Sequence, residues 1–140
     1  MQKLEKALYT ARGTAYAGRE GRAKSDDGAL DVVVSAPKEL GGPGKGTNPE
    51  QLFACGYAAC FGSAIGVVAR TQKINTGTFE VTCEVDLGKT STGFGIAARL
   101  KVKFSVLQGD QARSVVAKAH EICPYSNATR NNIDVQIDVV

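Results

Sequence analysis

The chain has 140 residues and a formal net charge of +3, with 43% hydrophobic and 22% charged residues. This balance is typical of an ordinary globular protein, and the length suits one domain spanning residues 1–140. The lysines and arginines are scattered, without a basic run or interleaved aromatic residues, so the composition argues against nucleic-acid binding.

The N-terminal segment shows no recognisable targeting signal. Residues 1–6 are followed by no apolar stretch, so no signal peptide is predicted and the protein is expected in the cytoplasm. In that compartment cysteines are more often reduced than paired into a structural framework, and the disulfides that do form tend to be transient and catalytic. The four cysteines of the chain are therefore read as thiols.

Residues up to 36 are predicted to form short strands and turns. The glycines at 18 and 21 bound one turn, and Asp26-Asp27-Gly28 is a strong hairpin signal. Leu30, Val32 and Val34 then alternate on one face of a strand.

The segment from Gly41 to Gly46 is rich in glycine and contains Lys45, a combination that resembles part of a phosphate-binding loop. A Walker motif requires Ser or Thr directly after the lysine, and Gly46 stands there instead. We therefore interpret this segment as a flexible connector that leads into a helix.

A long helix is predicted from about residue 49 to residue 72. Asn48 can cap its start, Pro49 suits the first helical position, and Gln51 completes a pattern similar to a capping box. Residues 52–69 contain no charge, which reaches the lower edge of a transmembrane span. About half of this stretch is Gly, Ala or Ser and the rest of the chain is amphipathic, so a buried central helix is the better interpretation.

Two strands with period-two patterns are predicted at residues 79–87 and 94–106. Their outward residues are acidic in the first strand and basic in the second, which favours an antiparallel pair. A second helix begins near Asp110, a short turn or helix follows Cys123, and a last strand covers 133–139. The order β-β-β-α-β-β-α-β, with mostly antiparallel pairing, indicates an α+β fold rather than a doubly wound one.

Cys60 and Cys123 are the candidate reactive residues. Cys60 lies inside the uncharged helix, where apolar burial disfavours the thiolate, so it becomes a catalyst only if the fold brings a cation to it. Cys123 opens the phrase Cys123-Pro124-Tyr125-Ser126, which resembles a glutaredoxin site with Ser at the second cysteine, but its late position contradicts that fold. If Pro124 begins a short helix, the helix dipole makes a thiol at position 123 more reactive. On these residues alone, Cys60 as nucleophile and Cys60 as core residue both stay open.

The remaining candidates have structural explanations. Cys83 points to the apolar face of its strand and is predicted to be an inert core residue. Cys55 lies five residues before Cys60, so their α-carbons are about 8 Å apart in a helix, beyond the usual disulfide limit of about 7 Å. His120 is the only histidine and there is no C-x-x-C pair, so no metal site is expected. We interpret His120 as a helix-end residue rather than a base.

Five segments match the pattern of a known protein family: residues 18–21, 27–32, 46–54, 56–61 and 120–133. On these segments the chain resembles the Ohr/OsmC family over nearly its whole length. Phe53 and Tyr57 in the helix, with Tyr125 after the second cysteine, favour the organic hydroperoxide resistance (Ohr) branch over the OsmC branch.

The resemblance implies an OsmC-like fold, with mostly antiparallel sheets around two central helices, and a tightly intertwined homodimer with active sites at its interface. It also implies a thiol peroxidase that reduces organic and fatty-acid hydroperoxides to alcohols, with dihydrolipoyl groups on proteins as the external reductant. No bound cofactor or metal and no membrane partner is expected.

The resemblance further assigns roles to four residues: Cys60 is the peroxidatic thiol, Cys123 the resolving thiol, Arg19 the activating cation, and Glu50 the carboxylate that orients Arg19. Cys55 departs from the family pattern, where a small residue such as Ala is expected, and this extra thiol raises the prospect of side reactions.

Glu50 and Cys60 are ten residues apart on one helix, which is about 15 Å along its axis. One Arg side chain can hardly span that distance, so our hypothesis is that Arg19 and Glu50 reach Cys60 from the other protomer. Two other functions use the same residues differently: a thiol–disulfide oxidoreductase without peroxide preference, and a non-enzymatic protein that binds apolar ligands.

Overall fold

The computed structural model describes residues 3–140. They form two compact units, residues 3–49 and Glu50–Val140. The single domain expected from the sequence stays a prediction.

The first unit is built on a three-stranded antiparallel sheet with the order β1-β2-β3. The turn between the last two strands includes Gly28 at a φ of 74°, as the Asp-Asp-Gly signal predicts. The elements are β1 (Gly13–Tyr16), η1 (Gly18–Glu20), β2 (Arg22–Ser25), β3 (Asp31–Val33) and η2 (Lys38–Leu40).

The glycine-rich segment of this unit, residues 41–46, packs against the end of β3. A Cβ atom on Gly46 would lie 2.4 Å from the carbonyl oxygen of Val33, so only glycine fits there. Next to it, Thr47 pairs with the buried Val34 in an isolated parallel bridge. Close packing of the backbone thus accounts for Gly46, and this supports the interpretation of the segment as a connector.

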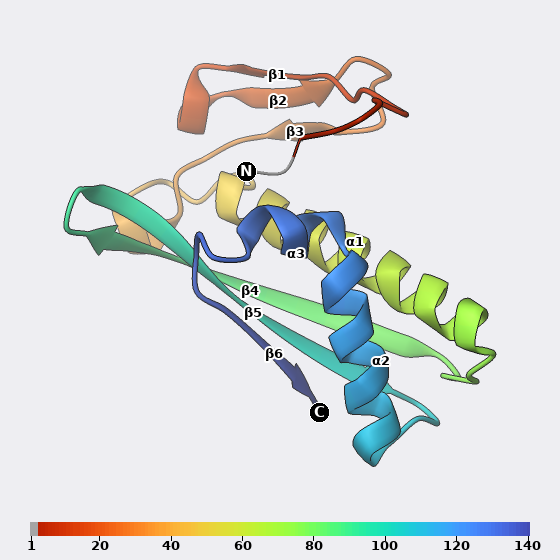
Figure 1. The fold of residues 1–140 in the computed structure, drawn as a ribbon. Helices are drawn as coiled ribbons and strands as arrows, with labels where there is room; N and C mark the ends of the chain where they lie inside the picture. Colours follow the sequence, from red (N-terminus) through yellow and green to blue (C-terminus); the bar gives the residue numbers. More distant parts are fainter. Residues whose placement is uncertain (1–2) are drawn as a thin grey trace. The chain divides into compact units, whose positions relative to one another are not determined.

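The second unit carries the long helix and the second sheet (Figure 1). The helix runs over the predicted residues, and the chain after Cys123 is helical. The order of helices and strands along the whole described chain, including the first sheet, confirms the α+β class. The elements are α1 (Pro49–Gln72), β4 (Phe79–Thr90), β5 (Gly93–Phe104), α2 (Gly109–Ile122), α3 (Pro124–Thr129) and β6 (Val135–Val139).

The second sheet has the order β4-β5-β6 and contains both pairing directions. β4 and β5 form a long antiparallel hairpin, in which Leu87 lies opposite Ile96. β6 pairs parallel to β5, with Leu100 opposite Ile137. The parallel direction follows from the connection between β5 and β6. After β5 ends, α2 and α3 carry the chain back toward the end of the sheet where β5 begins, and β6 starts there. Pairing is therefore mostly antiparallel, as predicted, with β6 as the exception.

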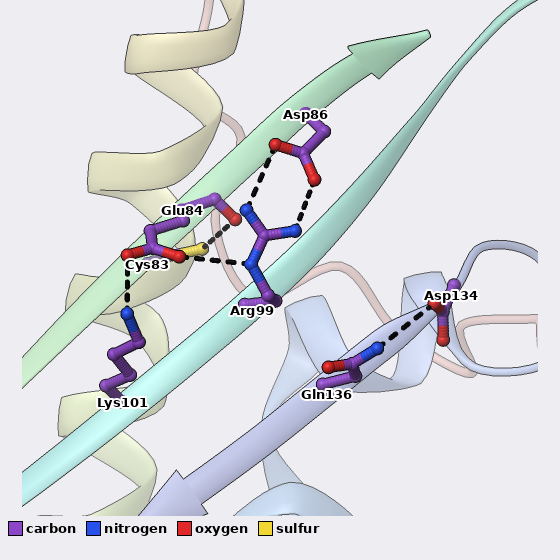
Figure 2. Close-up of polar contacts among 7 residues, drawn as sticks. All are labelled: Cys83, Glu84, Asp86, Arg99, Lys101, Asp134 and Gln136. Atoms are coloured by element: carbon purple, nitrogen blue, oxygen red, sulfur yellow. Dashed lines mark hydrogen bonds and ion pairs between the residues drawn. The ribbon is translucent and has the colours of Figure 1, made fainter. Parts of the chain in front are cut away.

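The outward face of this sheet carries the charge pattern expected from the sequence (Figure 2). Glu84 and Arg99 are directly opposite each other, and Arg99 Nε lies 3.0 Å from Glu84 Oε2. Lys101 Nζ lies 2.6 Å from the other oxygen of Glu84, and Asp86 also pairs with Arg99. Acidic residues on β4 and basic residues on β5 therefore attract each other across the strands, as predicted.

The inward face of the sheet packs against α1 and α2 to form the core of the second unit. The largest fully buried apolar side chains of this core come from α1, β5 and α2. Cys83 on β4 is partly buried against them. The principal members are Tyr57, Phe61, Ile65, Leu100, Val102 and Val115.

Within residues 3–140, α1 is the one helix that is long and apolar enough to cross a membrane. The core helix of a soluble protein has the same length and composition. In this protein Tyr57, Phe61 and Ile65 have no exposed surface and belong to the core. Their burial supports the interpretation of α1 as a core helix.

Candidate active site

Cys60 and Cys123, which are 63 residues apart in the sequence, are in direct contact, with 3.5 Å between their Sγ atoms. Cys60 lies in the middle of α1 and Cys123 lies at the junction of α2 and α3. Both are free thiols. A disulfide requires about 2.05 Å between sulfurs, so the two Sγ atoms are in contact but not bonded.

The local sequence explains why Cys123 occupies this junction. Its backbone N–H donates to the carbonyl oxygen of Ala119 at 2.9 Å, which completes the last turn of α2. The residue itself is extended, with a ψ of 122°, as the position before a proline favours. Pro124 then starts α3, where its missing N–H costs nothing.

The two thiols differ in their access to solvent. Cys60 is half-buried, whereas Cys123 has no exposed surface. A small molecule that enters from solvent therefore meets Cys60 first. This asymmetry suits a pair in which Cys60 reacts with the incoming molecule and Cys123 reacts afterwards with Cys60.

The surroundings of Cys60 oppose its ionisation. Burial raises the pKa of the Cys60 thiol, a hydrogen bond from the backbone N–H of Tyr125 opposes this rise, and the adjacent Cys123 thiol adds to it. The net direction is upward, so these surroundings favour the protonated thiol of Cys60. The structure thus agrees with the argument from sequence that an activating cation is needed.

Aromatic side chains line the side of α1 that faces α3. The ring of Phe53 lies 6.0 Å from that of Tyr57 and 5.8 Å from that of Tyr125, measured between centroids. Tyr57 and Tyr125 are 5.7 Å apart. These are contact distances for edge-on and tilted aromatic pairs. Phe53, Tyr57 and Tyr125 therefore form one apolar cluster.

The sequence did not reveal the partners of the Tyr57 hydroxyl. Tyr57 Oη lies 3.0 Å from Ser126 Oγ and 3.3 Å from Thr129 Oγ1, and all three side chains are buried. The network joins α1 to α3, the helix that begins next to Cys123. One signal was available, because a buried tyrosine hydroxyl nearly always has a partner.

Gly56 lets Tyr125 approach α1 closely. A Cβ atom at position 56 would lie 2.9 Å from Tyr125 Oη and 3.4 Å from the nearest ring carbons. The absence of a side chain at Gly56 therefore makes room for the ring of Tyr125. The backbone N–H of the same tyrosine faces Cys60.

The other two predicted site residues lie in different units. Arg19 belongs to η1 of the first unit, and Glu50 lies in the first turn of α1 at the start of the second. Both side chains are half-buried. Their roles toward Cys60 stay predictions.

His120 is the remaining residue that the sequence analysis considered as a candidate base. His120 lies in the last turn of α2, and burial followed by the charge of Arg130 lowers its pKa. No group of three or more His, Cys, Asp or Glu side chains that could hold a metal ion occurs within residues 3–140.

Comparisons with known proteins identify the family of the chain. The profile of the family described as OsmC-like protein matches residues 42–138. An organic hydroperoxide resistance protein of Xanthomonas axonopodis pv. citri (strain 306) is 50% identical over 139 residues, covering 98% of each chain. Organic hydroperoxide resistance protein OhrB of Bacillus subtilis (strain 168) is 46% identical over 135 residues, covering 95% of this chain and 98% of OhrB.

A solved structure supports the same relationship. The crystal structure of an organic hydroperoxide resistance protein from Legionella pneumophila superimposes with a TM-score of 0.92 at 50% sequence identity. It covers 96% of this chain and 98% of the Legionella chain. The fold is therefore OsmC-like, and the chain belongs to the OsmC-like protein family and, within it, to the organic hydroperoxide resistance proteins.

Proposed function

We propose that this protein is a cysteine-based peroxidase that reduces organic hydroperoxides, including those of fatty acids, to alcohols. The observation that carries the proposal is the 3.5 Å contact between Sγ of the half-buried Cys60 and Sγ of the fully buried Cys123. Membership of the organic hydroperoxide resistance proteins supports the substrate class.

The reaction begins at Cys60. Its thiolate attacks the terminal oxygen of the hydroperoxide, the O–O bond breaks, and the alkoxide leaves as an alcohol after taking a proton. Cys60 becomes a sulfenic acid. The Cys123 sulfur then attacks the Cys60 sulfur, water leaves, and a Cys60–Cys123 disulfide forms. The existing contact between the two sulfurs supports a fast second step, which also protects Cys60 from further oxidation.

The thiolate requires a cation, because burial raises the pKa of Cys60. We assign this role to Arg19, which stays charged and can donate several hydrogen bonds, and we assign Glu50 to orient it. Since Glu50 is about 15 Å from Cys60 along the helix, Arg19 and Glu50 act from the other protomer of an intertwined homodimer.

The apolar cluster of Phe53, Tyr57 and Tyr125 supports a preference for alkyl and acyl hydroperoxides over hydrogen peroxide. The disulfide returns to the dithiol by exchange with an external dithiol. We assign this step to the dihydrolipoyl group of a lipoylated protein in the cytoplasm.

Stopped-flow kinetics of the reduced protein tests the proposal. tert-Butyl hydroperoxide should oxidise the wild type rapidly and with a clear preference over hydrogen peroxide, and C60S should lose the reaction. C123S should react once and stop at the sulfenic acid. Slow reaction with both peroxides, at the rate of an ordinary thiol, contradicts the proposal and favours disulfide exchange or ligand binding.

Mixed dimers test the contribution of the second protomer. C60S subunits combined with R19A subunits should recover one working site per dimer, because Cys60 of one chain meets Arg19 of the other. A mixture as inactive as its two parents contradicts the assignment of Arg19 to the other protomer.

Turnover with a dihydrolipoyl protein compared with glutathione and thioredoxin tests the reductant. Sustained peroxide consumption with the lipoyl dithiol alone supports the assignment, and equal rates with all three contradict it.

A further inference from the structure

The two cysteines that the peroxidase mechanism does not use, Cys55 and Cys83, belong to facing elements of the second unit. Cys55 is exposed on α1. Cys83 is partly buried on the inward face of β4, the face that packs against the core. Their relative position follows from the register between α1 and β4.

α1 and β4 run in opposite directions, because a short turn connects the end of the helix to the start of the strand (Figure 1). Their contact point is Gly62, where a Cβ atom would lie 3.6 Å from the ring of Phe79 and 3.8 Å from the side chain of Val81. The inward residues of β4 near its start therefore face the side of α1 on which Gly62 lies.

Cys55 lies on that same side of α1, one heptad before Gly62. Seven residues of helix advance about 10 Å and turn the side chain by only about 20°. A strand covers about 10 Å in three residues. Counting from the Phe79 and Val81 contact, this distance along β4 leads to Cys83, so the helix-to-strand register brings Cys55 and Cys83 opposite each other.

The electrostatics of Cys83 agree with this register. Burial raises the pKa of Cys83 to about 11, and Cys55 and then Glu84 add to the rise through charge interactions.

This pair is separate from the active-site pair. Cys55 and Cys60 point to different sides of α1, about 140° apart. Cys60 faces Cys123 at the junction of α2 and α3, with 3.5 Å between the sulfurs, whereas Cys55 lies on the side that faces β4.

We propose that Cys55 and Cys83 form a second dithiol, which closes to an intramolecular disulfide between α1 and β4 when the protein meets a low-molecular-weight disulfide such as oxidised glutathione. The proposal does not depend on the peroxidase function, because neither thiol takes part in that reaction.

The chemistry balances in two exchange steps. The Cys55 thiolate attacks one sulfur of glutathione disulfide, the S–S bond breaks, and one glutathione thiolate leaves. Cys83 loses its proton and attacks the Cys55 sulfur of the mixed disulfide, and the second glutathione leaves as a thiol. The protein loses two electrons and two protons, and one glutathione disulfide becomes two glutathione molecules.

The second step sets the rate and the lifetime of the bond. A thiol with a pKa of about 11 supplies little thiolate near neutral pH, so closure is slow, and such a thiol is also a poor leaving group when the bond is reduced. The Cys55–Cys83 disulfide therefore forms and opens more slowly than the Cys60–Cys123 disulfide, and its presence records prolonged oxidation.

Peptide mapping of the full-length C60S/C123S variant tests the pairing. Trypsin places Cys55 in the peptide 46–70 and Cys83 in the peptide 74–89. After incubation with glutathione disulfide and blocking of free thiols, the expected product is peptide 46–70 joined to peptide 74–89 in a chain that runs as a monomer on a non-reducing gel. Adding C55A should abolish the product, and adding C83A should leave one glutathione on Cys55.

Two outcomes overturn the proposal. A stable glutathione adduct on Cys55 with Cys83 still free means that the sulfurs cannot meet. A Cys55–Cys55 bond between chains, seen as a dimer on the non-reducing gel, means that Cys55 faces a second copy instead. The wild type gives a check that does not depend on the substitutions, because peptide 119–130, which carries Cys123, should join peptide 46–70 before peptide 74–89 does.

Discussion

The hydroxyl of Tyr57 lies 3.0 Å from Oγ of Ser126, and neither side chain has any surface exposed to solvent. Tyr57 belongs to α1, three residues before Cys60, and Ser126 belongs to α3, three residues after Cys123. This hydrogen bond therefore joins the two helical segments that hold the reactive thiols together.

Replacing Tyr57 with Phe should loosen the contact between α1 and α3. The variant keeps the ring but leaves the buried hydroxyls of Ser126 and Thr129 without the tyrosine partner, at a cost of about 1–3 kcal/mol in the free energy of unfolding. Formation of the Cys60–Cys123 disulfide should slow more than the first reaction of Cys60 with peroxide. Urea unfolding and two-phase stopped-flow kinetics measure the two effects.

Tyr125→Phe is the matched control, because it removes a hydroxyl from the same aromatic cluster at a residue that is 38% exposed. Equal destabilisation by the two substitutions contradicts a special role for the Tyr57 hydroxyl.

Gly56→Ala should affect activity more than stability. The added Cβ would lie 2.9 Å from Tyr125 Oη, so the flexible Tyr125 side chain has to move, while alanine itself favours the helix by about 1 kcal/mol. We expect a free energy of unfolding close to that of the wild type and a slower reaction with bulky hydroperoxides, measured by stopped flow with cumene and tert-butyl hydroperoxide.

Gly62→Ala controls for the change in helix propensity, because its Cβ would make only ordinary contacts, the nearest at 3.6 Å to Phe79. A wild-type rate for Gly56→Ala, or the same loss in both variants, argues against displacement of Tyr125.

His120 should make the protein less stable in mild acid. Burial and then Arg130 lower the pKa of the folded residue below its ordinary value, so below about pH 6.5 the unfolded chain binds more protons than the folded one. This contribution to the free energy of unfolding is fully present above pH 6.5 and is lost as the pH falls through the lower, folded value.

Urea unfolding at pH 7.5, 6.5 and 5.5 measures this dependence, with His120→Gln as the comparison. The variant should show a flatter profile than the wild type over this range. Parallel profiles mean that other groups cause the acid sensitivity.

The charged face of the second sheet should contribute a small, salt-sensitive stabilisation. Glu84 binds both Arg99 and Lys101, and hydrogen bonds from Lys101 and then Arg99 lower its pKa. Since exposed ion pairs are screened by salt, Glu84→Gln should lower the melting temperature slightly at low ionic strength and not in 1 M NaCl. Glu80→Gln, on the same strand, is the control, and an equal effect at both salt concentrations excludes an electrostatic cause.

The sequence determined the elements and the arrangement of charges. Period-two patterns located β4 and β5, and the capping residues with the uncharged run located α1 at residues 49–72. These features depend on neighbouring residues, since propensity, capping and side-chain alternation act within a few positions of the chain. The sequence also singled out Cys60 and Cys123, but its own pattern left Cys60 equally plausible as a core residue.

Only the tertiary structure decided how these elements meet. It made β6 parallel to β5, gave the Tyr57 hydroxyl its partners on α3, and brought Cys60 into contact with Cys123, 63 residues further along the chain. It also made one thiol half-buried and the other fully buried. Contacts of this kind depend on how helices and strands pack into a shared core, and packing is set by all the surrounding side chains together rather than by the residues next to each cysteine.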